Sequence, residues 1–229
     1  MSIRKIKWLR RAFRFNYTVD DLKTLNEIPA STLRDSSKIV IVDNEIDKMQ
    51  TVIESLRNNG YNVQTRTDVT SVSDIAPYDI VISDIQGVGQ SIDSVEEGYG
   101  FIRQVSNLYP LKGIGVYSGV YFALKEPIEG MMLIQKDDSI QTWTENLDAK
   151  LRDIKDPAKM WKWIGKKLCE NNVPSIVMAK IEDDYVDRVI NNKSMDGFPS
   201  DRISDDSLMN ILNLAVRTIS LSVTASRLV

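Results

Sequence analysis

Short apolar runs that alternate with helical periods constrain the fold of this chain more than any other feature. Five runs, KIVIV, NVQTR, DIVIS, GIGVY and MMLIQ, occupy residues 38–42, 62–66, 79–83, 113–117 and 131–135. Between the first two, apolar residues recur at three-to-four spacing until Gly60, namely Ile46, Met49, Ile53 and Leu56. Short apolar strands separated by helices predict a parallel sheet that is covered on both faces.

Helical periods fill the remaining gaps in the same region. The segment 97–108 is predicted to form a helix whose inward face carries Phe101, Ile102, Val105 and Leu108. A second helix is predicted over 138–154, after the last strand. Five strands would then alternate with five helices through right-handed crossovers, and a ligand site would lie beyond the carboxyl ends of the strands.

The residue types that are missing exclude several kinds of chemistry. The chain has no histidine and a single cysteine, Cys169, so an internal disulfide, a Cys/His zinc site and an imidazole-activated nucleophile are excluded. Any bound metal would need oxygen ligands, which favours Mg²⁺ or Ca²⁺. No apolar run approaches the roughly 18 residues that cross a bilayer, and no secretory signal pattern opens the chain. We therefore expect a cytoplasmic protein.

Polar residues follow the predicted strands at the points where those strands end. Asp43, Asn44 and Glu45 follow the first strand, Asp84 ends the third, Ser118 follows the fourth and Lys136 the fifth. Two neighbouring carboxylates repel each other unless a cation compensates, so Asp43 and Asp84 predict a Mg²⁺ site. Ser118 and Lys136 would hold the oxygens of a phosphoryl group on Asp84.

The strand-end motifs IVIVDNE, DIVISDIQ, VYSG and LIQK resemble those of the receiver domain of two-component response regulators, the CheY-like family. The resemblance covers about residues 38–155. It implies a five-stranded, doubly wound parallel sheet of flavodoxin-like order 2-1-3-4-5. It also implies that Asp84 accepts the phosphoryl group, that Ser118 is the switch hydroxyl and that Lys136 pairs with the phosphate. The implied Mg²⁺ ligands are Asp43, Asn44, Asp84 and the backbone carbonyl of Gln86.

The sequence also departs from the pattern of that family. Asn44 stands where a second acidic residue is usual, and Asp137 stands where a proline is common. The loop after Asp84 is longer than usual, and Leu133 occupies the position of the aromatic switch residue in the fifth strand. These departures keep open a second interpretation, in which the domain is a receiver-like scaffold that is never phosphorylated.

The flanking regions differ from the centre in charge. Residues 1–37 carry 8 Lys and Arg against 4 Asp and Glu, residues 38–155 carry 11 against 18, and the remainder carries 10 of each. We therefore predict a basic arm and linker (1–37), an acidic receiver-like domain (38–155) and a helical output or dimerisation region (156–229). Residues 1–16 have the pattern of a basic amphipathic helix, suited to packing on protein, to anionic membranes or to nucleic acid. The linker is expected to be a helix or turn followed by a tether.

The C-terminal region reads as three helices. Asp156 is a predicted N-cap with Pro157 at N1, Pro174 opens a second helix, and Ser204 or Asp205 caps a third. Its neutral charge argues against DNA binding by this tail. Cys169 is expected to be a packed thiol. A homodimer or a larger protein complex is compatible with such a bundle.

These features lead to two hypotheses about function. In the first, a histidine kinase or a small phosphodonor transfers a phosphoryl group to Asp84 in the presence of Mg²⁺, and the protein signals by altered association. Self-phosphorylation and dephosphorylation would then be its only catalysis. In the second, the arm and tail mediate assembly around a receiver-like domain without phosphorylation.

Overall fold

The structure, a computed structural model, describes residues 15–25, 28–118 and 128–198. Its residues separate into two compact units. One unit contains the described residues before 28 together with those from Lys155 onward, and the other spans Ile28 to Ile154. We treat the two units separately below. The predicted division at residues 37 and 155 stays a prediction about domains.

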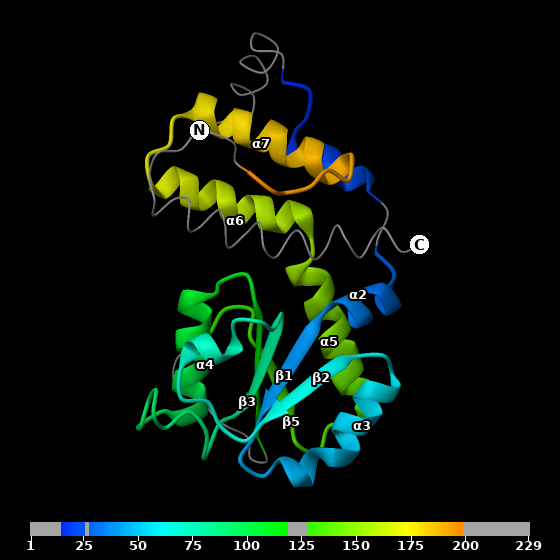
Figure 1. Ribbon diagram of the computed structural model, residues 1–229, viewed down its shortest axis with the longest axis vertical. Coiled ribbons are helices and arrows are strands. Elements are labelled where there is room, and N and C mark those ends of the chain that lie inside the picture. Colours follow the sequence, from blue (N-terminus) through cyan, green and yellow to red (C-terminus); the bar gives the residue numbers. More distant parts are fainter. Residues whose placement is uncertain (1–14, 26–27, 119–127, 199–229) are drawn as a thin grey trace. The chain divides into compact units, whose positions relative to one another are not determined.

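The larger unit contains one five-stranded sheet (Figure 1). Its strands are β1 (Lys38–Val42), β2 (Asn62–Arg66), β3 (Ile80–Asp84), β4 (Gly113–Ser118) and β5 (Met132–Gln135). All neighbouring pairs are parallel, and the order is β2-β1-β3-β4-β5. The predicted fold class and strand order are therefore confirmed.

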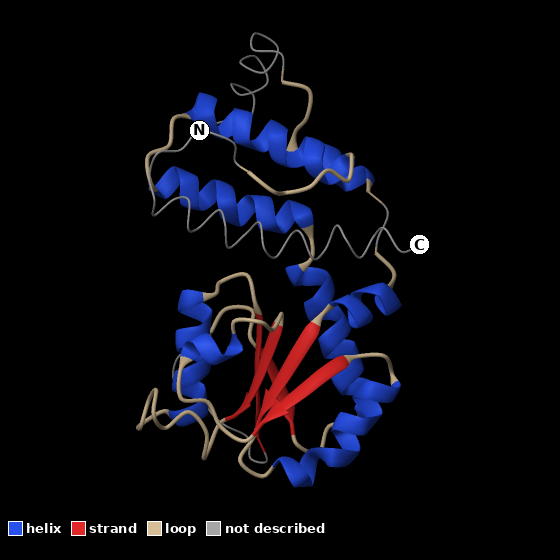
Figure 2. Ribbon diagram, viewed as in Figure 1, coloured by secondary structure: helices blue, strands red, loops and turns tan. Residues whose placement is uncertain are grey.

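Helices cover both faces of this sheet, as Figure 2 shows. The side chains of α3 (Gln50–Asn58) and α5 (Ile140–Ile154) form a core with one face of the strands. Those of α4 (Glu97–Leu108) form a second core with the other face. β1 and β3 lie between neighbours and are buried along nearly their whole length. That burial explains why both strands read as continuous apolar runs.

Two predictions about the helices of this unit need correction. The connection from β2 to β3 holds only the short 3-10 helix η3 (Val72–Ile75), because Pro77 follows closely and disfavours a longer helix. The predicted inward residue Leu108, the last residue of α4, is 61% exposed, and the next residue, Tyr109, packs against the core instead. A second short 3-10 helix, η2 (Ile46–Met49), precedes α3. The helix expected between β4 and β5 falls mostly outside the described residues.

The segment before β1 is more structured than the predicted tether. Helix α2 (Ala30–Ser36) buries Leu33 in the core shared with α3 and α5. Its Arg34 binds both carboxylate oxygens of Asp148 on α5, with Nε–Oδ1 and Nη2–Oδ2 distances of 2.9 and 2.5 Å. Tyr61 donates its hydroxyl to Asp148 Oδ1 at 2.6 Å and lies under the Arg34 guanidinium. This cluster fixes α2 to α5.

The second unit contains α6 (Pro157–Glu170), α7 (Ser175–Ile190) and the 3-10 helix η1 (Val19–Thr24). Asp156 caps α6 as predicted, accepting the backbone N–H of Ala158 at 2.8 Å. Carboxylates of α7 hold the N-terminal segment: Asp183 accepts the backbone N–H groups of Asn16 and Tyr17, each at 2.7 Å. The prediction of a packed Cys169 is wrong. The residue follows Leu168, the last of the buried stripe on α6, and is exposed, with its Sγ 3.7 Å from Met178 Sδ on α7.

Several predictions concern residues that lie outside the described ranges. They include most of the basic arm at 1–16 and the third C-terminal helix. Residues 15 and 16 are described, and they are not helical. None of the helices within 15–25, 28–118 and 128–198 combines the length and the apolar character that a bilayer crossing requires.

Candidate functional site

The predicted strand-end residues gather at one edge of the sheet because all five strands are parallel. Asp43 directly follows β1, Asp84 ends β3, Ser118 ends β4 and Lys136 directly follows β5. The register pairs Asp84 with Tyr117, and Ser118 with Gln135. The backbone N–H of Lys136 continues that pairing by donating to the Ser118 carbonyl at 3.0 Å. The carboxyl ends of β1, β3, β4 and β5 therefore supply the site.

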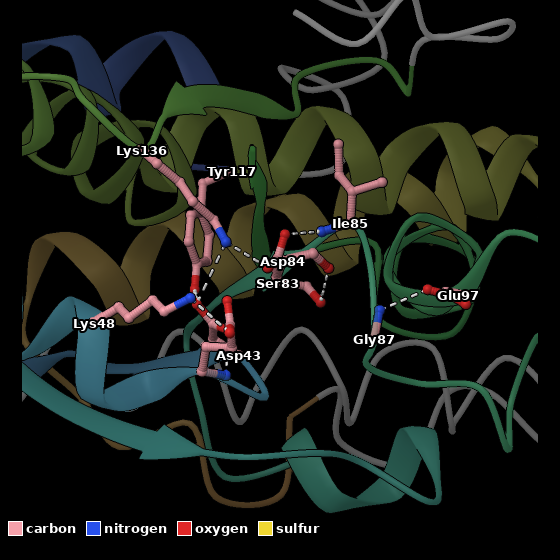
Figure 3. A network of polar contacts seen from close by, with 10 residues as sticks. Asp43, Lys48, Ser83, Asp84, Ile85, Gly87, Glu97, Tyr117 and Lys136 are labelled. Atoms are coloured by element: carbon pink, nitrogen blue, oxygen red, sulfur yellow. Dashed lines mark hydrogen bonds and ion pairs between the residues drawn. The ribbon is translucent and has the colours of Figure 1, made fainter. Parts of the chain in front are cut away.

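The Lys136 ammonium lies between the two carboxylates of the site (Figure 3). Its Nζ is 2.6 Å from Asp84 Oδ2 and 3.7 Å from Asp43 Oδ2. Both distances are within the range of an ion pair, and a charge-assisted hydrogen bond of this kind is stronger than a neutral one. One cation thus compensates two negative charges, which leaves the three groups with a net negative charge.

Asp43 is held by neutral donors as well as by Lys136. The backbone N–H of Glu45 donates to Asp43 Oδ1 at 2.7 Å, and the hydroxyl of Tyr117 donates to Oδ2. The residue is only 1% exposed. A buried carboxylate without donors would be strongly destabilised, so these hydrogen bonds are what permits Asp43 to lie inside the fold.

Asp84 is more open than Asp43. Its side chain is 10% exposed, and its Oδ1 accepts the backbone N–H of Ile85 at 2.7 Å. The carboxylate is therefore oriented from one side by a backbone donor and from the other by Lys136. An oriented carboxylate oxygen of this kind, with some solvent access left, can act as a nucleophile toward an incoming electrophile.

Tyr117 is a residue of the site that the sequence analysis missed. It is fully buried at the carboxyl end of β4, one residue before Ser118. Burial, together with the hydrogen bond to Asp43 and the charges of Asp43 and Asp84, raises the pKa of the phenol well above its ordinary value. The phenol therefore keeps its proton and remains a donor. The sequence signal that could have identified Tyr117 is a tyrosine at the end of an otherwise apolar strand. A buried hydroxyl requires a hydrogen-bond partner, and polar partners lie at the strand ends.

The long loop after Asp84 has a defined conformation. Glu97, at the start of α4, accepts the backbone N–H of Gly87 at 2.6 Å and the side-chain amide of Gln90 at 3.0 Å. Asp68 accepts the backbone N–H of Gly89 at 2.7 Å. Figure 3 shows the Glu97 carboxylate facing Gly87. Glu97 and Asp68 are thus acidic residues that shape the loop, and no pattern in the sequence predicts either role.

Asn44 lies against this loop. Gly87 has a φ of +77°, and a Cβ atom placed on it would lie 2.3 Å from Asn44 Nδ2. The backbone conformation therefore favours glycine there, and a side chain at this position would displace that of Asn44. Asn44 and Gln86 are exposed. The structure brings Asp43, Asp84 and Lys136 into direct contact, and it places Asn44 and Gln86 on the loops beside them.

The oxygen atoms of the site fit a hard divalent cation. Within the described ranges, no group of three or more His, Cys, Asp or Glu side chains could hold a metal ion. The site offers two carboxylates, those of Asp43 and Asp84. The Lys136 ammonium is within ion-pair distance of both, so a single cation can contact both carboxylates. Each carboxylate oxygen has more than one lone pair, so its hydrogen bond leaves room for a cation. Oxygen donors of this kind suit Mg²⁺ or Ca²⁺.

Comparisons with known proteins find similar chains among solved structures of receiver domains. No protein-family model matches the sequence, and no curated protein matches it. Similar solved structures include a receiver domain from Clostridium thermocellum, with 18% identity, a TM-score of 0.40 and coverage of 50% of this chain and 94% of the other. The receiver domain of an HD-domain protein from Pseudomonas fluorescens is 17% identical, with a TM-score of 0.45 and coverage of 52% of this chain and 96% of the other. The chemotaxis protein CheY4 of Vibrio cholerae is 21% identical, with a TM-score of 0.41 and coverage of 49% of this chain and 97% of the other. These similarities are weak, and the observed strand order defines the fold without them.

Proposed function

We propose that this protein is a response-regulator-like signalling protein that accepts a phosphoryl group on Asp84. The observation that carries the proposal is the position of the Lys136 ammonium, 2.6 Å from Asp84 Oδ2 and 3.7 Å from Asp43 Oδ2, at the carboxyl edge of a parallel sheet. A partly accessible carboxylate beside a cation and a second carboxylate is suited to receive an electrophilic phosphorus.

In the proposed reaction an Asp84 oxygen attacks the phosphorus of the donor in line with the leaving group. The new O–P bond forms an acyl phosphate, and the bond between phosphorus and the donor breaks, with its electron pair leaving on the donor atom. Lys136 compensates the charge that arrives on the phosphoryl oxygens, and the Ile85 N–H keeps the carboxylate oriented. Ser118 is proposed to donate its hydroxyl to a phosphoryl oxygen.

Asp43, Asp84 and the Gln86 carbonyl, with Asn44 beside them, would hold Mg²⁺, which would neutralise charge on the phosphoryl group. Because the chain has no histidine, a phosphohistidine donor must be another protein, a histidine kinase. A small phosphodonor such as acetyl phosphate would serve in its place. The signal would leave the protein as a change in its association with a partner or a second copy.

Intact mass measurement after incubation with acetyl phosphate and Mg²⁺ tests this proposal. The wild-type chain should gain one phosphoryl group, and Asp84→Asn should gain none. Asp137→Asn is the matched control, because Asp137 is an exposed acid next to Lys136 and has no part in the proposed reaction. The proposal is wrong if the wild type stays unmodified, or if Asp84→Asn gains the same mass.

A second candidate function is a phosphorylation-independent interaction scaffold. It is favoured by the observation that both carboxylates of the site already have hydrogen-bond donors within the protein, without any ligand. Tyr117 and the Glu45 N–H hold Asp43, while Lys136 and the Ile85 N–H hold Asp84. In this case association with a partner would be equally strong in the wild type and in Asp84→Asn. Loss of association in that variant would exclude the scaffold.

A further inference from the structure

Tyr117 connects the acidic site to the hydrophobic core beneath α5. Its hydroxyl donates to Asp43 Oδ2, and the Lys136 ammonium lies 5.1 Å from the centre of its ring. The same ring packs edge-on against Trp143 of α5, with the ring centres 5.9 Å apart and the planes at 62°. One side chain thus contacts an acid of the site, the cation of the site and a core residue of a helix.

The contact with Asp43 is one that neither partner can lose without cost. Asp43 and Tyr117 are both buried, and a buried carboxylate or phenol that loses its partner is left desolvated. The oxygen that accepts the Tyr117 hydroxyl is also the oxygen that faces Lys136. A change in charge or position at Lys136 or Asp43 therefore acts directly on the phenol.

The contact with Trp143 depends on packing rather than on a hydrogen bond. Trp143 is fully buried, and its indole Nε1 has no hydrogen-bond partner among the residues that the structure describes. Its orientation is therefore set by neighbouring side chains, among which the Tyr117 ring lies in the same cluster as Leu147 and Leu151. An indole without a fixed hydrogen bond follows a shift of the ring against which it packs.

Helix α5 leads from Trp143 to a second cluster. The residue after Trp143, Thr144, offers its backbone carbonyl to the Tyr61 hydroxyl at 3.1 Å. Asp148, one turn further, binds Arg34 of α2. A displacement of Trp143 would thus act on the segment of α5 that holds α2.

We propose that Tyr117 is a positioning residue that holds Asp43 and couples the charge at the site to Trp143 and α5. Its role as a signalling route rests on the proposed function, because a cation or phosphoryl group must then alter the site. The coupling itself requires neither. The coupling runs from Tyr117 on β4 to Trp143 on α5. Leu133 on β5 is 61% exposed and makes no aromatic contact in this coupling.

Fluorine NMR of the full chain labelled with 5-fluorotryptophan tests the coupling. The chain has four tryptophans, and Trp143→Phe identifies the resonance of Trp143. Asp43→Asn perturbs the site, and its effect on that resonance is measured in the wild type and in Tyr117→Phe. We expect Asp43→Asn to shift the Trp143 resonance clearly in the wild type, and to shift it by less than half as much in Tyr117→Phe. Tyr61→Phe is the matched control, since Tyr61 also touches α5 but not the site. In this variant the shift should persist.

An equal shift with and without the Tyr117 hydroxyl, or no shift in either background, would overturn the proposal. If Asp43→Asn does not fold, Lys136→Met supplies the perturbation, because Lys136 also lies against the Tyr117 ring. Phosphorylation of the wild type by acetyl phosphate and Mg²⁺ is measured on the same sample. An unmodified Asp84 would refute the proposed function, and the Trp143 shift would still decide the coupling.

Discussion

Two clusters in the larger unit combine an aspartate, a tyrosine hydroxyl and a basic side chain. In one, Asp148 binds Tyr61 and Arg34, and in the other, Asp43 binds Tyr117 and lies near Lys136. Both basic groups lie over the ring of the tyrosine, at 4.8 and 5.1 Å. The residue types are similar, yet the two clusters differ in what their cation can do.

The difference lies in the basic residue and in the number of acids. Arg34 binds both oxygens of one carboxylate through its planar guanidinium, so the cluster is closed and holds α2 to α5. Lys136 is a point charge shared between Asp43 and the more exposed Asp84. A single extra carboxylate and a rotatable ammonium thus distinguish the proposed phosphorylation site from the structural cluster.

The largest expected effect is on phosphoryl transfer. Replacing Lys136 by Met removes the charge that compensates the incoming phosphoryl group, so the rate of transfer from acetyl phosphate should fall by roughly 10²-fold or more. Arg34→Met should leave that rate unchanged. The rates are measured by intact mass over time. A Lys136→Met variant that reacts at the wild-type rate would erase the distinction between the clusters.

The next effect is on stability. Arg34→Met leaves Asp148 without its paired cation and should lower the free energy of unfolding by about 1–3 kcal/mol, as measured by urea denaturation. Lys48→Met is the control, because Lys48 and Glu45 form a solvent-exposed pair whose loss should change the free energy of unfolding little. Equal losses in the two variants would mean that the Arg34 cluster is not a structural one.

A smaller effect concerns pH. Burial opposes ionisation of Asp148, but hydrogen bonds from Arg34 and Tyr61 outweigh it and lower the pKa of the carboxyl. Its contribution should be fully present above the unfolded-state value of about 3.9 and should be lost as the pH falls through the lower folded-state value. The stability difference between wild type and Asp148→Asn, measured by urea denaturation, should therefore shrink on acidification. A difference that grows instead would contradict this assignment.

The smallest effect concerns the loop beside the site. Alanine at Gly87 would adopt a positive φ and meet Asn44, whereas alanine at Gly60, with a φ of +87°, would meet no atom within 4 Å. Both variants should lose about 1 kcal/mol of stability from backbone strain. We expect only Gly87→Ala also to slow phosphorylation, as measured by mass. Equal rates in both would show that the loop conformation does not matter to the site.

The sequence predicted the sheet well because each strand carries its own signal. β1 and β3 are apolar on both faces, and that pattern is sufficient to indicate a parallel sheet. Once the strands were parallel, Asp43, Asp84 and Lys136 had to lie at one edge. The convergence of these three residues followed from topology alone.

Contacts between distant segments could not be predicted in the same way. The sequence does not say that the Tyr117 hydroxyl reaches Asp43 on another strand, or that Glu97 accepts the N–H of Gly87. These depend on side-chain rotamers and loop conformations, which no local pattern encodes. The predicted tether includes Arg34, because no local pattern reveals a partner as distant in the sequence as Asp148.

The most direct test of the account identifies the modified residue. After incubation with acetyl phosphate and Mg²⁺, borohydride reduction converts an aspartyl phosphate to homoserine, which peptide mass spectrometry locates. We predict homoserine at position 84 and at no other position. Its absence at position 84, or its appearance at another aspartate, would contradict the central claim that Lys136 and Asp43 prepare Asp84 to accept a phosphoryl group.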